Sequence, residues 1–238
     1  MREKISQAVP PTKRVADDVV VALDLKSGTT LWKASLPGTP SGRSSSSTPC
    51  IRDGKLYTVG SNRIFSVDLA KGKVDWETPL ELDGIAGSVL VHDDLVIALV
   101  GNLRAYHRES GKLAWTNKQV SGKSASPALW KTQKKEFIAC NGGKAVFLVD
   151  PKDGTTFGTG PGGGSSTPVC QGDWMLVHGK DEKTGLIAYH WKDSSFTEAW
   201  RFPKLPSECN HPRLRKGGVV TNCADNHQVQ AIQVCSLH

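Results

Sequence analysis

The sequence predicts an all-β protein, a β-propeller of four-stranded antiparallel blades, and three observations lead to this prediction. One column recurs every 39 to 44 residues, and its members are Asp24, Asp68, His107, Asp150, His190 and Gln233. A glycine stands four positions after this column in four copies, and a tryptophan ends most copies. Each full copy also holds four short apolar runs separated by turn residues. A period of about 40 residues with four strands per unit is typical of propeller blades.

The domain organisation follows from where the repeat begins. Residues 1–18 contain Pro10 and Pro11 and several charges, so we expect an N-terminal tail or linker there. The repeat then predicts one propeller domain over residues 19–238. A hydrophobic content of 38% is too high for a disordered chain and suits a folded β protein.

The first copy, VALDLKSGTTLW at Val21–Trp32, predicts a strand, a tight turn and a second strand. Glycine is expected in the turn because hairpin turns need positive φ, and this position is held by Gly28, Gly72, Gly111 and Gly154. The tryptophans that end the copies are predicted to dock one blade on the next, and they are Trp32, Trp76, Trp115 and Trp200. Phe157 and Gly158 replace the tryptophan in one copy, where we expect a weaker contact.

Combining front and back halves predicts five to six repeat units. The complete blades are expected over residues 44–77, 85–116, 124–158 and 165–201. Residues 19–34 supply only the last two strands of a blade, and the copy that begins at Cys209 supplies only the first three. The N-terminal strands could pair into the last blade and close a ring. The duplicated third strand instead favours an open arc, an incomplete part of a six- to eight-bladed ring.

The motif A-x-D-x-x-x-G-x-x-x-W, preceded by S-x-P and a short D-G-x-x-Y hairpin, resembles the pyrroloquinoline-quinone-type (PQQ-like) propeller repeat. The copies ALDLKSGTTLW and SVDLAKGKVDW match best, and the resemblance covers about residues 19–238. It is closest in character to the BamB-like propellers, which keep the repeat without cofactor or chemistry. The resemblance therefore implies a non-catalytic binding or scaffolding propeller with a protein partner, in the periplasm or otherwise outside the cytoplasm.

The other branch of the family implies an alternative function, as a remnant or part of a quinoprotein (PQQ-dependent) dehydrogenase. That branch binds the quinone and Ca²⁺ and has two adjacent cysteines, whereas this sequence has no Cys-Cys pair. It also shows no recognisable cluster of the oxygen ligands that Ca²⁺ takes. We therefore expect no cofactor, and PQQ and Ca²⁺ are disfavoured.

The charge of the chain permits an anionic partner, because 30 Lys and Arg stand against 23 Asp and Glu. The basic residues are scattered, and the nearest approach to a run is Lys131, Lys134 and Lys135, in an expected loop. A solvated loop is favoured over a nucleic-acid patch. The N-terminus has no signal-peptide pattern, and no apolar run approaches the roughly 20 residues of a membrane span.

One weak metal candidate stands near the C-terminus. Cys209, His211, Cys223 and His227 are the residue types that hold tetrahedral Zn²⁺, although ordinary strand positions explain them as well. Six cysteines without a C-x-x-C pair do not predict a disulfide scaffold. Cys50 and Cys170 each follow an S-T-P signal, so we expect equivalent inner-strand positions and buried thiols.

Two further patterns favour a structural interpretation over a chemical one. His107 and His190 share the column of the aspartates, which predicts a role in the following turn more than a pH switch or a catalytic base. The run GTGPGGGSSTP at residues 158–168 lacks the lysine and helix of a phosphate loop, so a flexible connection is expected.

A partner or ligand is expected at an end of the central channel, where the inner strands and their loops converge. The S-x-P positions lead into those inner strands. The candidates for this face are Arg43, Ser47, Ser126, Ser166, Asn210 and His211.

Overall fold

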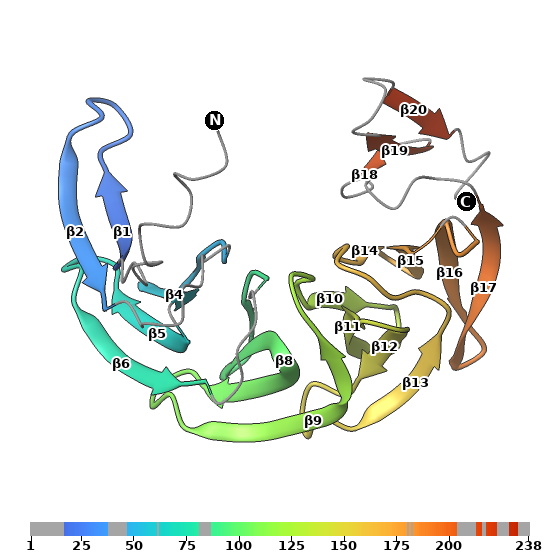
Figure 1. Cartoon of the computed structure of the whole chain (residues 1–238), viewed down its shortest axis with the longest axis horizontal. Coiled ribbons are helices and arrows are strands. Elements are labelled where there is room, and N and C mark those ends of the chain that lie inside the picture. Colours follow the sequence, from blue (N-terminus) through green and yellow to red (C-terminus); the bar gives the residue numbers. More distant parts are fainter. Residues whose placement is uncertain are drawn as a thin grey trace, which may run out of the picture.

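The computed structural model describes residues 17–37, 47–60, 62–80, 87–179, 181, 183–203, 213–215, 218–222 and 229–232. Of the last three segments only the backbone is described. Twenty strands form six antiparallel sheets that follow one another along an arc (Figure 1). This confirms the predicted all-β propeller of repeated blades.

The first half of the arc contains three sheets. Unit 1 consists of β1 (Asp18–Leu23) and β2 (Thr30–Leu36). Blade 2 consists of β3 (Cys50–Arg52), β4 (Lys55–Gly60), β5 (Arg63–Asp68) and β6 (Val74–Pro79). Blade 3 consists of β7 (Leu90–His92), β8 (Leu95–His107) and β9 (Leu113–Gly122).

The second half contains the other three sheets. Blade 4 consists of β10 (Ala128–Lys131), β11 (Glu136–Asn141), β12 (Val146–Val149) and β13 (Thr156–Gly160). Blade 5 consists of β14 (Val169–Gln171), β15 (Trp174–His178), β16 (Leu186–Lys192) and β17 (Ser195–Phe202). Unit 6 consists of β18 (Arg213–Arg215), β19 (Gly218–Asn222) and β20 (Val229–Ile232).

Blade 3 has three strands because one long strand, β8, occupies the positions that two strands hold in the other blades. Gly101, in its middle, has a φ of 70°, which allows the chain to turn back at that point. The amide of Arg108, just after β8, donates to the carbonyl of Asp94, just before it, at 2.7 Å. The two ends of β8 therefore lie side by side, and its halves correspond to the second and third strands of the other blades.

The first strand of each blade lies on the inside of the arc and the last strand on the outside (Figure 1). Successive first strands are neighbours, since β3 lies beside β7, β7 beside β10, β10 beside β14 and β14 beside β18. Unit 1 and unit 6 lie at the two ends of the arc. Among the described strands β1 pairs only with β2, and β20 pairs only with β19, so these strands do not close the ring.

The hydrophobic core lies between the sheets rather than within one of them. Separate buried clusters join unit 1 to blade 2, blade 2 to blade 3, blade 3 to blade 4, and blade 4 to blade 5. Each sheet thus packs mainly on its two neighbours, as in other repeat proteins. Stability therefore depends on the boundaries between blades.

The structure corrects the expectation that Cys50 and Cys170 are equivalent. Cys50 is the first residue of the three-residue strand β3, two positions before its end, whereas Cys170 is the middle residue of β14, one position before its end. Side chains alternate along a strand, so the two thiols point to opposite faces of their blades. Cys50 packs toward blade 3, whereas Cys170 packs back toward blade 4.

The part of the chain that the structure describes contains no helix with the length and apolar character required to cross a membrane.

Candidate functional site

The recurring aspartates shape the turn that follows them. Asp68 Oδ1 accepts hydrogen bonds from the amides of Ala70 and Lys71 at 3.0 and 2.9 Å. Asp24 likewise accepts from the amides of Lys26 and Ser27, and Asp150 accepts from the amide of Lys152. The turn-forming role expected of this column is local chemistry between a short acid and nearby amides.

The two histidines in the column do not repeat this pattern with their side chains. His107 Nδ1 lies 3.5 Å from a carboxylate oxygen of Asp94, and the His190 ring lies 4.4 Å from the ring of Trp174. The backbone of His107 still makes the turn, because the amide of Gly111 donates to its carbonyl at 2.8 Å. The aspartate turns make the same backbone bond, so the turn at His107 forms without the side-chain bonds that aspartate adds elsewhere.

The tryptophan and glycine columns meet at the blade boundaries. The Trp32 indole lies over Gly72, where a Cβ atom would come closer than 3.0 Å to it, and Trp76 lies over Gly111 in the same way. Each indole Nε1 also donates to a carbonyl in the turn of the next blade. These bonds are Trp32 to Leu69 at 2.8 Å, Trp76 to Arg108 at 2.8 Å, and Trp115 to Pro151 at 3.2 Å. Glycine is therefore required there by the neighbouring ring as well as by its positive φ.

The boundary between blades 4 and 5 uses a different arrangement. Gly158 pairs with Leu148 at the position that Trp115 holds in blade 3. The Phe196 ring of blade 5 lies over it, 2.8 Å from where a Cβ atom would stand. Rings from both blades gather around this point, so aromatic packing takes the place of the missing tryptophan.

The candidates at the S-x-P positions belong to two different columns. Ser126 stands directly before its proline, whereas Ser47 and Ser166 stand one position earlier. The hydroxyls directly before the proline column link successive blades. The bonds are Thr48 N to Ser88 Oγ at 3.3 Å, Ser88 N to Ser126 Oγ at 2.8 Å, and Ser126 N to Thr167 Oγ1 at 3.0 Å.

This series of hydrogen bonds was not predicted from the sequence, although the Ser or Thr directly before the proline column could have indicated it. Ser47 Oγ accepts a hydrogen bond from the amide of Val59 at 3.3 Å, so its partner lies within its own blade. Ser166 Oγ is buried, and none of the described residues bonds to it. These serines lie at the beginning of the inner strands, and Ser47 and Ser126 use their hydroxyls for internal bonds.

The other sequence candidates lie outside the described residues. These are the face residues Arg43, Asn210 and His211 and the metal candidates Cys209, His211, Cys223 and His227. Within the ranges that the structure does describe, no three His, Cys, Asp or Glu side chains are grouped as a metal site would need.

The glycine-rich run at residues 158–168 is anchored, which corrects the expected flexible connection. The buried Asn141 side chain accepts a hydrogen bond from the amide of Gly163 at 2.7 Å and donates one to the carbonyl of Ser166 at 3.1 Å. It also donates to the carbonyl of His178 in blade 5 at 3.0 Å. One amide thus fixes the run against two blades.

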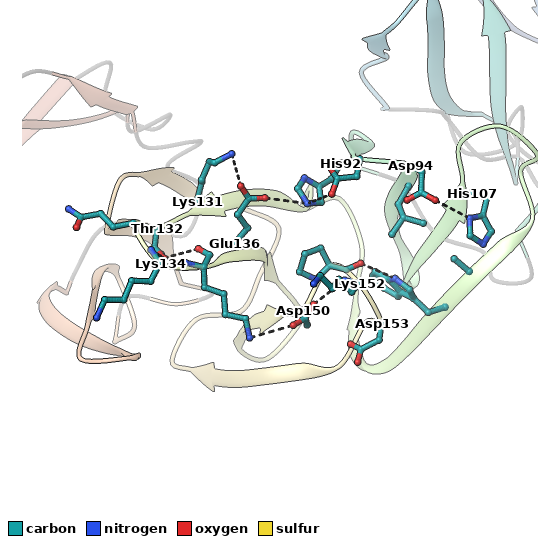
Figure 2. A pocket seen from close by; sticks show the side chains of 17 residues that line it. His92, Asp94, His107, Lys131, Thr132, Lys134, Glu136, Asp150, Lys152 and Asp153 are labelled. Atoms are coloured by element: carbon teal, nitrogen blue, oxygen red, sulfur yellow. Dashed lines mark hydrogen bonds and ion pairs between the residues drawn. The ribbon is translucent and has the colours of Figure 1, made fainter.

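A pocket of about 940 Å³ opens between blades 3 and 4 (Figure 2). Its wall comes from the turn between β7 and β8, the loop between β10 and β11, and the turn between β12 and β13, and Trp115 also lines it. The inner strands begin at the S-x-P positions and end at this pocket. The pocket therefore lies on the face of the arc opposite the S-x-P candidates.

Ion pairs organise the pocket wall. Lys131 Nζ lies 2.5 Å from one carboxylate oxygen of Glu136, and His92 Nε2 lies 3.4 Å from the other (Figure 2). Lys135 Nζ lies 3.4 Å from Asp150. The hydrogen bond between Lys131 and Glu136 raises the pKa of the lysine and lowers the pKa of the acid, so both remain charged.

Two lysines of the wall have no ion-pair partner among the residues that the structure describes. Lys134 and Lys152 are exposed, and among the described residues no carboxylate lies within ion-pair distance of either ammonium group. Lysines 131, 134 and 135 are exposed at the loop between β10 and β11, which agrees with the expected solvated loop, and they also line the pocket. The pocket offers charge and hydrogen bonds but shows no nucleophile held next to a base.

The comparison with family models decides the family. The model described as "Outer membrane protein assembly factor BamB" matches residues 16–157, more than half of the chain. The chain belongs to this family. No curated protein matches the sequence.

Solved structures agree with the BamB-like fold. The crystal structure of BamB from Moraxella catarrhalis is 16% identical, with a TM-score of 0.57 over 90% of this chain and 79% of that one. A chain of the mitotic checkpoint complex is 14% identical, with a TM-score of 0.64 over 92% and 71%. The computationally designed Ika8 protein is 12% identical, with a TM-score of 0.50 over 87% and 75%. At these identities the likeness shows the fold alone.

Proposed function

We propose that this chain is a non-catalytic, protein-binding propeller that acts outside the cytoplasm in the assembly of outer membrane proteins. The observation that carries the proposal is the match of the BamB family model to residues 16–157, since the family description names that role. The pocket supports a binding function, because it combines ion pairs along its wall with the exposed charges of Lys134 and Lys152, which have no ion-pair partner among the described residues.

The partner is proposed to bind at the pocket face of blades 3 and 4 and to present groups of both charges there, because the pocket lining holds five acids beside its four lysines. Lys134 and Lys152 have no ion-pair partner among the described residues, and carboxylates of the partner would pair with them. The opposite face is less suited, because Ser47 and Ser126 already use their hydroxyls within the arc.

Site-specific photo-crosslinking in the host cell tests the protein-binding role. A photoreactive residue at position 134 or 152 is expected to capture a protein partner, since both side chains are exposed on the pocket face. Position 144 is the matched control, because Lys144 is also exposed, in the turn between β11 and β12 at the other end of blade 4. Equal capture from position 144, or none from 134 and 152, would contradict the proposed face.

A second experiment separates the binding role from the quinoprotein alternative. A cofactor that binds only the folded protein raises its melting temperature. We expect pyrroloquinoline quinone and Ca²⁺, added together, to leave the melting temperature unchanged. A clear rise, with dye-linked oxidation of an alcohol or sugar, would support a dehydrogenase instead.

A further inference from the structure

The turns that join the first strand to the second have the same geometry in blades 2 and 3. Asp53 directly follows β3, and Asp93 directly follows β7. Their φ values are 48° and 49°. Arg52 Nε, at the end of β3, lies 3.7 Å from the Asp53 carboxylate. In the same way His92 Nε2, at the end of β7, lies 3.4 Å from the Asp93 carboxylate. Asp93 is therefore the counterpart of Asp53.

At the boundary between blades 2 and 3 this acid has a second cationic partner. Arg108 directly follows β8 of blade 3, and its Nη1 donates a hydrogen bond to Asp53 of blade 2 at 2.6 Å. The Arg108 side chain is mostly buried, with 19% exposed. One guanidinium thus joins the turns of two adjacent blades.

The boundary between blades 3 and 4 has a proline where this arginine would stand. Pro151 follows Asp150 of the repeat column as Arg108 follows His107. The carbonyls of Pro151 and Arg108 each accept the indole bond from the preceding blade. A proline ring has no group that can pair with a carboxylate. The pocket of about 940 Å³ opens at this boundary, and both Asp93 and Pro151 line it.

The Asp93 carboxylate is accessible in this pocket. Its side chain is 80% exposed, and among the described residues His92 is its one ion-pair partner. Lys131 lines the same pocket, but its ammonium group pairs with Glu136 at 2.5 Å. Asp94, the next residue, is also well exposed and lines the pocket (Figure 2). Two adjacent carboxylates thus line the pocket without an ammonium or guanidinium partner in the described part of the chain.

We propose that the pocket between blades 3 and 4 binds an arginine side chain of the protein partner, with its guanidinium on Asp93 as Arg108 lies on Asp53. Arginine suits this position because its planar fork of donors matches a carboxylate. The inference rests on the proposed function and names the group of the partner that enters the pocket. The exposed Lys134 and Lys152 line the same pocket, so acidic residues beside that arginine complete the match.

Nuclear magnetic resonance titration of the purified full chain with N-acetyl-arginine amide tests this inference. The amide resonances of Asp93 and Asp94 are expected to shift to saturation, and N-acetyl-lysine amide is expected to bind more weakly. Asp93→Asn is expected to weaken binding of the arginine derivative roughly fivefold, the upper range for an exposed ion pair. Asp53→Asn is the matched control, because Asp53 has the same backbone conformation and already holds an arginine; it should bind like the native chain.

A substitution that fills the pocket from within gives a second readout. Pro151→Arg supplies the missing guanidinium beside Asp93, so it is expected to abolish binding of the arginine derivative. Pro151→Ala removes the ring without adding a charge, and it should bind like the native chain. The amide spectrum of each variant verifies that it is folded.

Four results would each overturn the inference. They are no binding of the arginine derivative to the native chain, equal binding of the lysine derivative, equal losses from Asp53→Asn and Asp93→Asn, and native binding by Pro151→Arg. This titration and the photo-crosslinking fail separately. If positions 134 and 152 capture a protein while the arginine derivative does not bind, the protein-binding role stands and this inference fails. If the arginine derivative binds and neither position captures a protein, the guanidinium site stands and the proposed function fails.

Discussion

The boundary between blades 3 and 4 and the boundary between blades 4 and 5 perform the same task with different residues. At the first, Trp115 of blade 3 lies over Gly154 of blade 4 and donates to the carbonyl of Pro151. At the second, the glycine belongs to the earlier blade and the ring to the later one, since Phe196 lies over Gly158.

The indole hydrogen bond is also replaced at the second boundary. Trp130 of β10 donates its Nε1 to the carbonyl of Gly172 in blade 5 at 2.8 Å. Trp130 is fully buried, and its ring lies 6.2 Å from Trp191 and 6.5 Å from Phe196. A boundary therefore requires a flat ring over a glycine and an indole bonded to a turn carbonyl, and neither is tied to one position in the repeat.

Removal of a docking ring should have the largest effect on stability. Trp115→Ala is expected to lower the free energy of unfolding by about 3–5 kcal/mol, because it leaves a cavity between two blades. Trp200→Ala is expected to cost much less because that indole has no acceptor among the described residues. Urea denaturation followed by fluorescence measures both, and equal losses would show that the Gly154 contact adds nothing.

The glycine under the ring can be tested separately from its backbone conformation. Gly154 and Gly28 have φ values of 75° and 70°, so alanine is strained equally at both. Only Gly154 lies under an indole. Gly154→Ala should therefore reduce the free energy of unfolding by roughly 1–3 kcal/mol more than Gly28→Ala, the usual cost of overpacking. Thermal or chemical denaturation of the pair measures this difference, and indistinguishable variants would argue against the tight contact.

Replacement of the indole hydrogen bonds should have a smaller and similar effect at both kinds of boundary. Trp76→Phe and Trp130→Phe each keep a ring and lose a 2.8 Å bond to a turn carbonyl. Each is expected to cost about 1 kcal/mol for the lost bond, with a further contribution from the smaller ring. The free energies of unfolding of the two variants should agree closely. If only Trp76→Phe lowered the free energy of unfolding, the indole bond of Trp130 would not be equivalent to the one that Trp76 makes.

The smallest expected effect concerns the turns beside these boundaries. The amide of Lys71, followed by weaker contributions from the Lys71 charge and the amide of Ala70, lowers the pKa of Asp68 below its ordinary value. A carboxylate with a lowered folded-state pKa stabilises the fold above its unfolded pKa, and the benefit is lost as the pH falls through the folded value. NMR titration of the Asp68 carboxyl carbon should show the lowered pKa, and Asp68→Asn should remove this part of the acid dependence. An ordinary pKa would contradict the turn-capping role.

The repeat made much of the fold predictable, because its period specifies the blades. Gly72 and Trp76 repeat at a fixed spacing, so the turns and the last strands could be located from the sequence. The contacts at Gly158 could not, because Phe196 lies 38 residues later and outside the glycine-tryptophan spacing. Nothing in the sequence of one blade specifies which ring of the next blade will face it.

The pocket was less predictable than the fold. Lys131 and Glu136 lie close in the sequence, but His92, at the end of β7, meets Glu136 only because blades 3 and 4 pack together. Asp150 follows β12 of blade 4 and reaches Lys135 through the fold of that blade. The S-x-P pattern instead predicted a binding site on the opposite face of the arc. There a shift of one residue between Ser47 and Ser126 places them in different columns with different partners.

The most direct test of the central claim compares two phenylalanines of β17. Phe196→Ala should lower the free energy of unfolding by about 2–4 kcal/mol, as expected for a large side chain at a packed boundary. Phe202→Ala is the matched control, because Phe202 is 42% exposed on the same strand, and it should cost well under about 1 kcal/mol. Urea denaturation of both variants gives this difference. If Phe196→Ala cost no more than Phe202→Ala, the boundary between blades 4 and 5 would not depend on the reversed ring, and the account would be contradicted.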